Sequence, residues 1–77
     1  MHEVMIRFRF VSRNQTMECS LDERLSLNDN FLLLKQIGDL RAETCEIYDP
    51  RKKIFLNKDI PLREFTISHF ILLYVFE

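Results

Sequence analysis

The longest unbroken apolar run in the sequence extends from Phe70 to Phe76. It is far shorter than the roughly 20 residues that a membrane-spanning helix needs, and its length is typical of a strand. Successive side chains of a strand point to opposite faces, so this run presents apolar side chains on both faces of its sheet. We therefore predict a strand that is buried on both sides within a small sheet. We expect no direct insertion into a membrane.

The first part of the chain predicts a β-hairpin. Residues 4–11 alternate between apolar side chains and a second set that includes Arg7 and Arg9, and this period of two is typical of a half-buried strand. A polar turn follows, and the alternation resumes over residues 16–21. We predict that the second strand folds back on the first, with Cys19 in the core and both arginines on the outer side.

A single amphipathic helix is expected next. Ser26 is a good helix N-cap, Asp29 lies near the positive end of the helix dipole, and Gly38 is a good residue to follow the helix. A rotation of 100° per residue gives one apolar stripe, which consists of Leu27, Phe31, Leu34 and Ile37. Leu33 flanks this stripe, and Leu32 falls nearly opposite to it. We therefore expect Leu32 to face solvent.

The rest of the chain predicts a second hairpin and the closing strand. Short strands are expected at 45–48 and 54–56, on either side of a turn at 49–53 that contains a proline. A loop with about one helical turn near 62–65 leads to the strand at 70–76. The order of elements is thus strand, strand, helix, strand, strand, strand.

Two hairpins can cover one amphipathic helix only if the sheet wraps across it, with the last strand beside the first. We predict a single α+β domain over residues 1–77, with a mixed sheet of four to five strands on one helix. This arrangement leaves the far face of the sheet open to solvent, and that face becomes the place to look for function.

Composition and charge exclude several classes of function. The 77 residues carry a formal net charge of −1, so no long-range field attracts nucleic acid or anionic lipid. The basic residues at 51–53 and Lys58 are expected to form a solvated turn, and we expect no nucleic-acid partner. Cys19 and Cys45 fit neither a disulfide framework nor a CxxC motif, and no signal peptide is recognisable. We expect a reducing, cytoplasmic location.

The sequence offers no set of residues for catalysis or for holding a cofactor. The soft metal ligands are few, and none has the two-to-five-residue spacing of a zinc or iron–sulfur site: His2, Cys19, Cys45 and His69. The alternation buries both cysteines, away from any base that could activate a thiol. We expect no enzyme activity, no metal and no cofactor.

The outer face of the sheet is the main candidate for a binding site. One set of side chains on the last strand fills the core, and the other is either covered by neighbouring side chains or forms an apolar patch. A patch rimmed by Arg7 and Arg9 would have the usual anatomy of a protein interface. We predict Arg7, Arg9 and Leu73 as protein-binding residues, with Leu32 on the helix as an independent contact.

The segment from Leu56 to Ile67 resembles a segment of ubiquitin, in which two leucines, an aromatic residue and an isoleucine have these spacings. The matching residues are Leu56, Leu62, Phe65 and Ile67. Together with the opening hairpin and the single helix, this resemblance implies the ubiquitin-like β-grasp fold over nearly the whole chain. The sequence ends at Phe76 and Glu77 without a glycine pair, so we expect no conjugation to other proteins.

Two further segments, 20–23 and 48–55, are similar to the small ubiquitin-like proteins of Gram-positive type VII secretion loci, the YukD and EsaB type. This resemblance implies a cytoplasmic accessory or regulatory protein beside a membrane secretion machine. A component of that machine would then be the protein partner.

Two alternatives remain open at the level of sequence. The chain could be a structural unit that forms a homodimer through the same apolar sheet face. The sulfur-carrier proteins of thiamin and molybdopterin synthesis share the fold, but they require the terminal glycine pair, so this second alternative is the weaker one.

Overall fold

The computed structural model describes residues 2–34, 45–65 and 67–77. Its elements, in chain order, are β1 (Glu3–Phe10), β2 (Gln15–Asp22), α1 (Leu27–Leu33), β3 (Glu46–Asp49), β4 (Ile54–Phe55), the 3-10 helix η3 (Leu62–Glu64) and β5 (Ile71–Phe76). The predicted order of strands and helix is confirmed, and each strand boundary lies within one residue of its predicted position.

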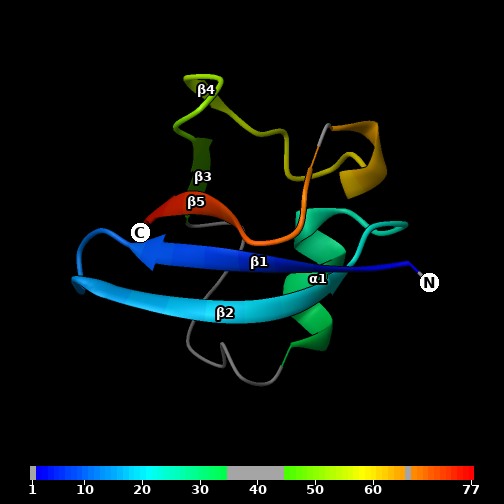
Figure 1. Cartoon of the computed structure of the whole chain (residues 1–77), viewed down its shortest axis with the longest axis horizontal. Coiled ribbons are helices and arrows are strands. Elements are labelled where there is room, and N and C mark those ends of the chain that lie inside the picture. Colours follow the sequence, from blue (N-terminus) through cyan, green and yellow to red (C-terminus); the bar gives the residue numbers. More distant parts are fainter. Residues whose placement is uncertain (1, 35–44, 66) are drawn as a thin grey trace.

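The strands form one five-stranded mixed sheet in the order β2-β1-β5-β3-β4. β1 is antiparallel to β2 and parallel to β5, and β3 is antiparallel to both β5 and β4. The last strand therefore lies at the centre, beside the first, as predicted. Figure 1 shows α1 crossing one face of the β1–β2 hairpin, and among the described residues no helix covers the opposite face of the sheet.

The core lies between α1 and the inner face of the sheet. Its buried apolar residues are Val4, Ile6, Phe8, Phe10, Cys19, Leu21, Leu27, Phe31, Cys45, Ile47, Leu56, Leu62, Ile71, Leu73 and Val75. Phe8 of β1 and Phe31 of α1 meet edge to face, with ring centroids 5.6 Å apart. Both cysteines are in the core as predicted, and burial raises the pKa of the Cys19 and the Cys45 thiol.

The start of α1 agrees with the prediction. The Ser26 side-chain oxygen accepts a hydrogen bond from the Asp29 backbone N–H at 3.1 Å, which satisfies one of the free donors at the helix start. The helix ends at Leu33, earlier than predicted, because the predicted stripe residue Leu34 has an extended backbone and is the C-cap. Ile37 of the predicted stripe, and Gly38, which we predicted to follow the helix, lie outside the described residues.

Asn30 is a buried polar residue of α1 that the apolar pattern does not reveal. Its side-chain oxygen accepts from the Asp22 backbone N–H at 2.8 Å, and its side-chain nitrogen donates to the Asp22 and Ser26 carbonyls at 3.0 and 2.9 Å. These bonds use both ends of the amide, so the group is buried without losing its hydrogen bonds. Asn30 thereby fixes the connection between β2 and α1.

Phe70 is not part of the last strand, although we predicted that it begins the strand. Its backbone has a φ of 64°, in the left-handed region that a bulky residue rarely occupies. The Phe70 backbone N–H donates to the Met5 carbonyl at 2.7 Å. The residue is thus held in the turn that enters β5, and the strand starts at Ile71.

Candidate protein-binding face

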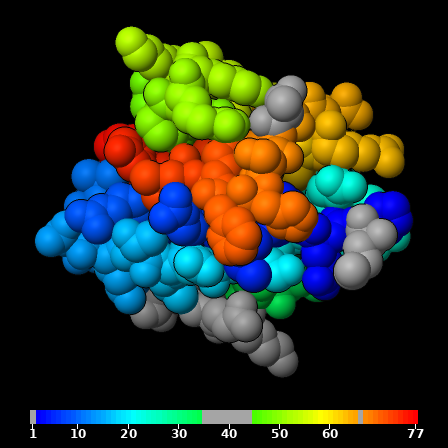
Figure 2. Space-filling model, in the orientation of Figure 1, coloured from blue at the N-terminus to red at the C-terminus, as the bar shows by residue number. Residues whose placement is uncertain are grey.

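The face of the sheet opposite α1 carries one continuous row of paired residues across all five strands. The cross-strand row consists of Thr16, Arg9, Tyr74, Tyr48 and Phe55, contributed by β2, β1, β5, β3 and β4 in that order. Paired residues on one face of a sheet bring their side chains into contact range. The row therefore joins a polar end at β2 to an aromatic end at β4. In Figure 2, β5 (orange to red) runs between β1 (blue) and the β3–β4 hairpin (yellow-green).

The aromatic end of the row forms an exposed aromatic cluster, which consists of Tyr48, Phe55, Tyr74 and Phe76. The Tyr48 ring lies 5.0 Å from that of Phe55 and 6.4 Å from that of Tyr74, and Phe55 and Phe76 are 6.1 Å apart. These separations are in the favourable range for aromatic pairs. Phe55 is 58% exposed and Phe76 is 40% exposed. The cluster is therefore packed laterally but open to solvent from outside.

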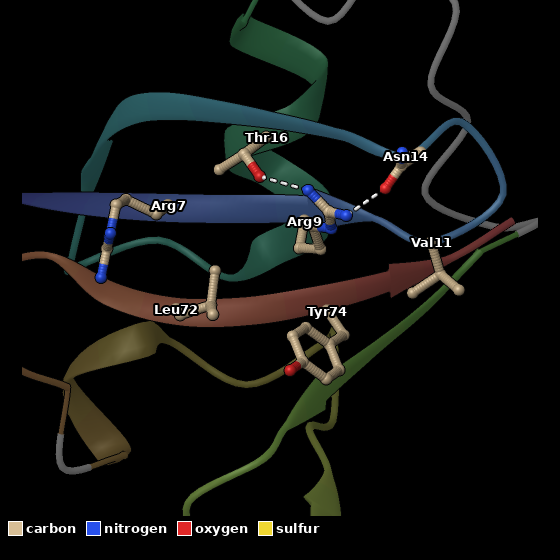
Figure 3. Close-up of a pocket in the computed structure, with 7 residues that line it drawn as sticks. All are labelled: Arg7, Arg9, Val11, Asn14, Thr16, Leu72 and Tyr74. Atoms are coloured by element: carbon tan, nitrogen blue, oxygen red, sulfur yellow. Dashed lines mark hydrogen bonds between the residues drawn. The ribbon is translucent and has the colours of Figure 1, made fainter.

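A hollow of about 570 Å³ lies next to the aromatic cluster, over β2, β1 and β5. The residues that line this arginine hollow are Arg7, Arg9, Val11, Asn14, Thr16, Leu72 and Tyr74. Figure 3 shows Leu72 and Tyr74 of β5 beside the two arginines of β1. The lining of the hollow thus combines apolar side chains with two cationic ones.

The two arginines are held in place by neutral acceptors. Arg9 donates to the Thr16 hydroxyl at 3.2 Å and to the side-chain oxygen of Asn14, as the dashed lines in Figure 3 show. The Arg7 Nε donates to the Phe70 carbonyl at 3.3 Å. These contacts orient both guanidinium groups without neutralising their charge.

Of the residues predicted for the site, Arg7 and Arg9 lie on the outer face as expected. The expectation that Leu73 also faces outward is wrong, because Leu73 is fully buried at 0% exposure. The parallel register pairs Leu73 with Phe8, a core residue, and pairs Arg7 with Leu72. Leu72 and Tyr74 therefore take the outward positions on β5. They are half-buried and Phe76 is exposed, so the prediction of a strand buried on both sides is wrong for the outer side.

Leu32 is 83% exposed, and this confirms the predicted orientation of the helix. The neighbouring Leu33, predicted beside the core stripe, is also exposed. Both lie on α1, on the other side of the sheet from the arginine hollow. The structure therefore does not bring Leu32 together with Arg7 and Arg9, and any contact that it makes is a separate one.

The predicted basic turn is partly neutralised by neighbouring groups. The Arg51 Nε lies 3.7 Å from the buried carboxylate of Asp49, and the Lys58 Nζ lies 3.9 Å from Glu46. The Asp49 side chain also accepts from the Arg51 backbone N–H at 2.9 Å. The carboxylate thus serves the turn between β3 and β4.

The described part of the chain contains neither a metal-binding cluster nor a membrane-spanning helix. No group of three or more His, Cys, Asp or Glu side chains there could hold a metal ion. Within the same residues, no helix has both the length and the apolar character needed to cross a membrane.

Four residues of the outer face were not predicted from the sequence, namely Asn14, Thr16, Tyr48 and Phe55. The alternation within 16–21 and 45–48 assigns Thr16 and Tyr48 to the outer side, so their orientation was accessible. The cross-strand row was not, because it depends on which residues pair between strands. Asn14 has a φ of 51° in the β1–β2 turn, a conformation that asparagine tolerates better than most residues.

Comparison with known proteins shows similarity in structure but not in sequence. No protein-family model matches the sequence, and no curated protein matches it. The ubiquitin-like domain of yeast Ddi1 has a TM-score of 0.71 and 14% identity over 97% of this chain and 88% of that chain. A structure described by the words "molecular mimicry of SUMO promotes DNA repair" has a TM-score of 0.79 and 9% identity, over 97% of this chain and 91% of that chain.

The same fold also occurs within an enzyme complex. A chain of the toluene 4-monooxygenase complex has a TM-score of 0.68 and 10% identity, over 96% of each chain. At these identities the similarity concerns the fold and not the activity. The five-stranded mixed sheet on one helix, together with these neighbours, shows that this chain has the ubiquitin-like β-grasp fold.

Proposed function

We propose that this chain is a non-catalytic module that binds a protein partner through the outer face of its sheet. The observation that carries this proposal is the aromatic cluster, in which Phe55 and Phe76 expose ring surface beside the half-buried Tyr48 and Tyr74. Aromatic residues are enriched in the centres of protein interfaces because they bury a large area with little loss of side-chain entropy. The arginines of the hollow would supply the polar rim.

We further propose that the partner belongs to a type VII secretion system of a Gram-positive bacterium, and that the chain acts there as a cytoplasmic accessory or regulatory component. The support is the resemblance of segments 20–23 and 48–55 to the YukD and EsaB type. The second of these segments begins at Tyr48 and ends at Phe55, so it contributes two rings of the aromatic cluster. A family resemblance and an exposed surface thus involve the same residues.

Photo-crosslinking in Gram-positive cells tests this function. A photoreactive phenylalanine analogue at position 55 is expected to give an adduct with another protein. The same analogue at position 63, on η3 and away from the outer face, serves as the matched control and is expected to give none. Mass spectrometry of the adduct would identify the partner and show whether a secretion locus encodes it.

Two results would contradict the proposal. An adduct formed only between two copies of this chain would favour the homodimeric structural role instead. Equal adducts at positions 55 and 63, or no adduct at either, would show that the outer face is not a specific binding surface.

A further inference from the structure

We propose that the arginine hollow binds an extended acidic segment of the partner, with carboxylates at two alternate positions and an apolar side chain at the next alternate position. This inference rests on the proposed function, because it names the chemistry of the partner at the polar end of the cross-strand row. It is carried by charge, by the spacing of residues on β1 and by the volume of the hollow.

The charge argument comes from a comparison of the arginines. Of the four described arginines outside the sheet face, Arg13, Arg24 and Arg51 have a carboxylate within ion-pair distance, at 2.8, 2.7 and 3.7 Å respectively. The fourth is Arg63 of η3, for which the described residues supply no carboxylate. Within the described residues, neither Arg7 nor Arg9 has one. Both still have N–H groups that can donate to a carboxylate from outside. The outer face therefore carries two positive charges that the described residues do not neutralise.

Arg9 is the better placed of the two. Its neighbour on β2 is the neutral Thr16, and its neighbour on β5 is Tyr74. Its bonds to Asn14 and Thr16 fix the guanidinium group before a ligand arrives, which lowers the entropy lost on binding. A carboxylate at this position would accept from a cation that is already oriented.

Arg7 is the weaker anchor, because the exposed Glu18 lies opposite it on β2. The two groups form no ion pair in the structure, but the negative charge of Glu18 reduces the local potential. We therefore expect Arg7 to contribute less than Arg9. Neutralising Glu18 should strengthen the binding of an acidic segment.

The spacing on β1 gives the pattern of the occupant. Arg7 and Arg9 lie at alternate positions of β1, and Val11 is the next alternate residue, directly after the end of the strand. All three line the hollow, and Val11 is exposed. Alternate residues of any extended segment are about 7 Å apart, so two alternate carboxylates and one apolar side chain match this row. Leu72 and Tyr74 lie beside the row and add apolar contact. A hollow of about 570 Å³ is large enough for such side chains.

The first test uses two synthetic peptides and NMR. The acidic probe is a pentapeptide, blocked at both ends, with glutamate at its first and third positions, leucine at its fifth and serine between. The control has glutamine in place of both glutamates. The acidic peptide and its reversed sequence are titrated separately into the ¹⁵N-labelled chain, and at least one is expected to shift amides of β1 and β5 at the hollow. The control peptide is expected to bind at least fivefold more weakly.

Matched variants locate the effect. Arg9→Gln is expected to weaken binding of the acidic peptide by about fivefold, the factor for a partly exposed charge pair. Arg7→Gln is expected to weaken it by less. Arg63→Gln removes the same charge from η3, where the described residues also leave the arginine without a carboxylate, and it is expected to change nothing. Glu18→Gln is expected to tighten binding. Arg9→Lys, which keeps the charge, separates loss of charge from any loss of folding.

Several outcomes would overturn the inference. Equal binding of the acidic and glutamine peptides would exclude a role for the carboxylates. An equal loss of peptide binding in the Arg9→Gln and Arg63→Gln variants would exclude the hollow as the binding site. Shifts of the same amides by inorganic phosphate at equal concentration would indicate a general anion site.

The inference about the hollow can be wrong even if the proposed protein-binding function is right. If the crosslink from position 55 persists undiminished in a variant with both Arg7→Gln and Arg9→Gln, the partner uses the aromatic cluster and not the hollow. If the crosslink is absent from the unaltered chain as well, the proposed function itself is wrong.

Discussion

The two faces of β5 are both largely apolar but have opposite roles. On the inner face, Ile71, Leu73 and Val75 are buried against the helix and the rest of the core. On the outer face, Leu72 and Tyr74 are half-buried and Phe76 is exposed. Hydrophobicity alone therefore does not separate core from surface in this strand. The parallel register with β1 does, because it pairs Leu73 with Phe8 and Tyr74 with Arg9.

The largest difference in stability is expected when the same substitution, leucine to serine, is made on each of the two faces of β5. Leu73→Ser removes a fully buried side chain and places a hydroxyl in the core, so we expect a loss of about 4 kcal/mol in the free energy of unfolding. Leu72→Ser changes the outer face, and we expect a loss of about 1 kcal/mol. Urea denaturation followed by circular dichroism measures both. Equal losses would mean that the two faces do not differ as described.

The second comparison lies within α1, between its buried and its exposed side. Asn30→Ala leaves the Asp22 backbone N–H without its partner, and we expect a loss of about 2 kcal/mol. Leu32→Ser should change stability by at most about 0.5 kcal/mol because Leu32 faces solvent. Thermal unfolding of both variants beside the unaltered chain tests this. A large loss on changing Leu32 would show that this side of the helix is covered.

The third prediction separates binding from stability on the outer face. Phe55→Ser exposes little new surface, so we expect a loss of no more than about 1 kcal/mol in stability. Capture of the partner by a crosslinker at position 76 should nevertheless fall severalfold, because the ring at position 55 is part of the same cluster. If the Phe55→Ser variant captures the partner as well as the unaltered chain does, the Phe55 ring serves only packing within the cluster and not binding. Light scattering of the variant also reports any change in oligomeric state.

The smallest effect concerns an arginine that does have a carboxylate partner. Arg24 holds the pKa of the Asp22 carboxyl at about 2, below its ordinary value of 3.8, chiefly through a side-chain hydrogen bond. Because the pKa is lowered in the folded state, the pair stabilises the fold above about pH 4, and this contribution disappears as pH falls towards 2. Asp22→Asn keeps an acceptor oxygen but should remove this part of the acid dependence. Unfolding midpoints between pH 2 and 5 would detect the difference, and identical profiles would contradict the prediction.

Much of the fold could be predicted from local patterns. The period of two in β1 and the capping residue Ser26 are local signals, and both identified their elements correctly. The fold class followed from the order of those elements. In β5 the pattern was ambiguous because both sets of side chains are apolar, so the orientation of Leu73 could not be decided within the strand itself.

The candidate site was harder to predict because it depends on pairing between distant segments. Arg9 and Tyr48 each showed an outward orientation in the sequence, but only the strand register places them in one row. Buried polar groups escaped detection for a different reason. Backbone groups bond the buried amide of Asn30 and one carboxylate oxygen, Oδ1, of the buried Asp49, and a hydrophobicity pattern does not register such bonds.

The central position of β5 has a consequence for how the chain folds during synthesis. β5 follows the other strands along the chain and joins β1 to β3. Until the ribosome has released it, β1 and β2 can pair with each other, but the two hairpins have no strand between them. Contacts between segments so far apart in sequence form slowly, and partly synthesised chains expose apolar surface in the meantime. We therefore expect nascent chains to need protection from aggregation until β5 emerges, at which point the sheet closes in a single late step.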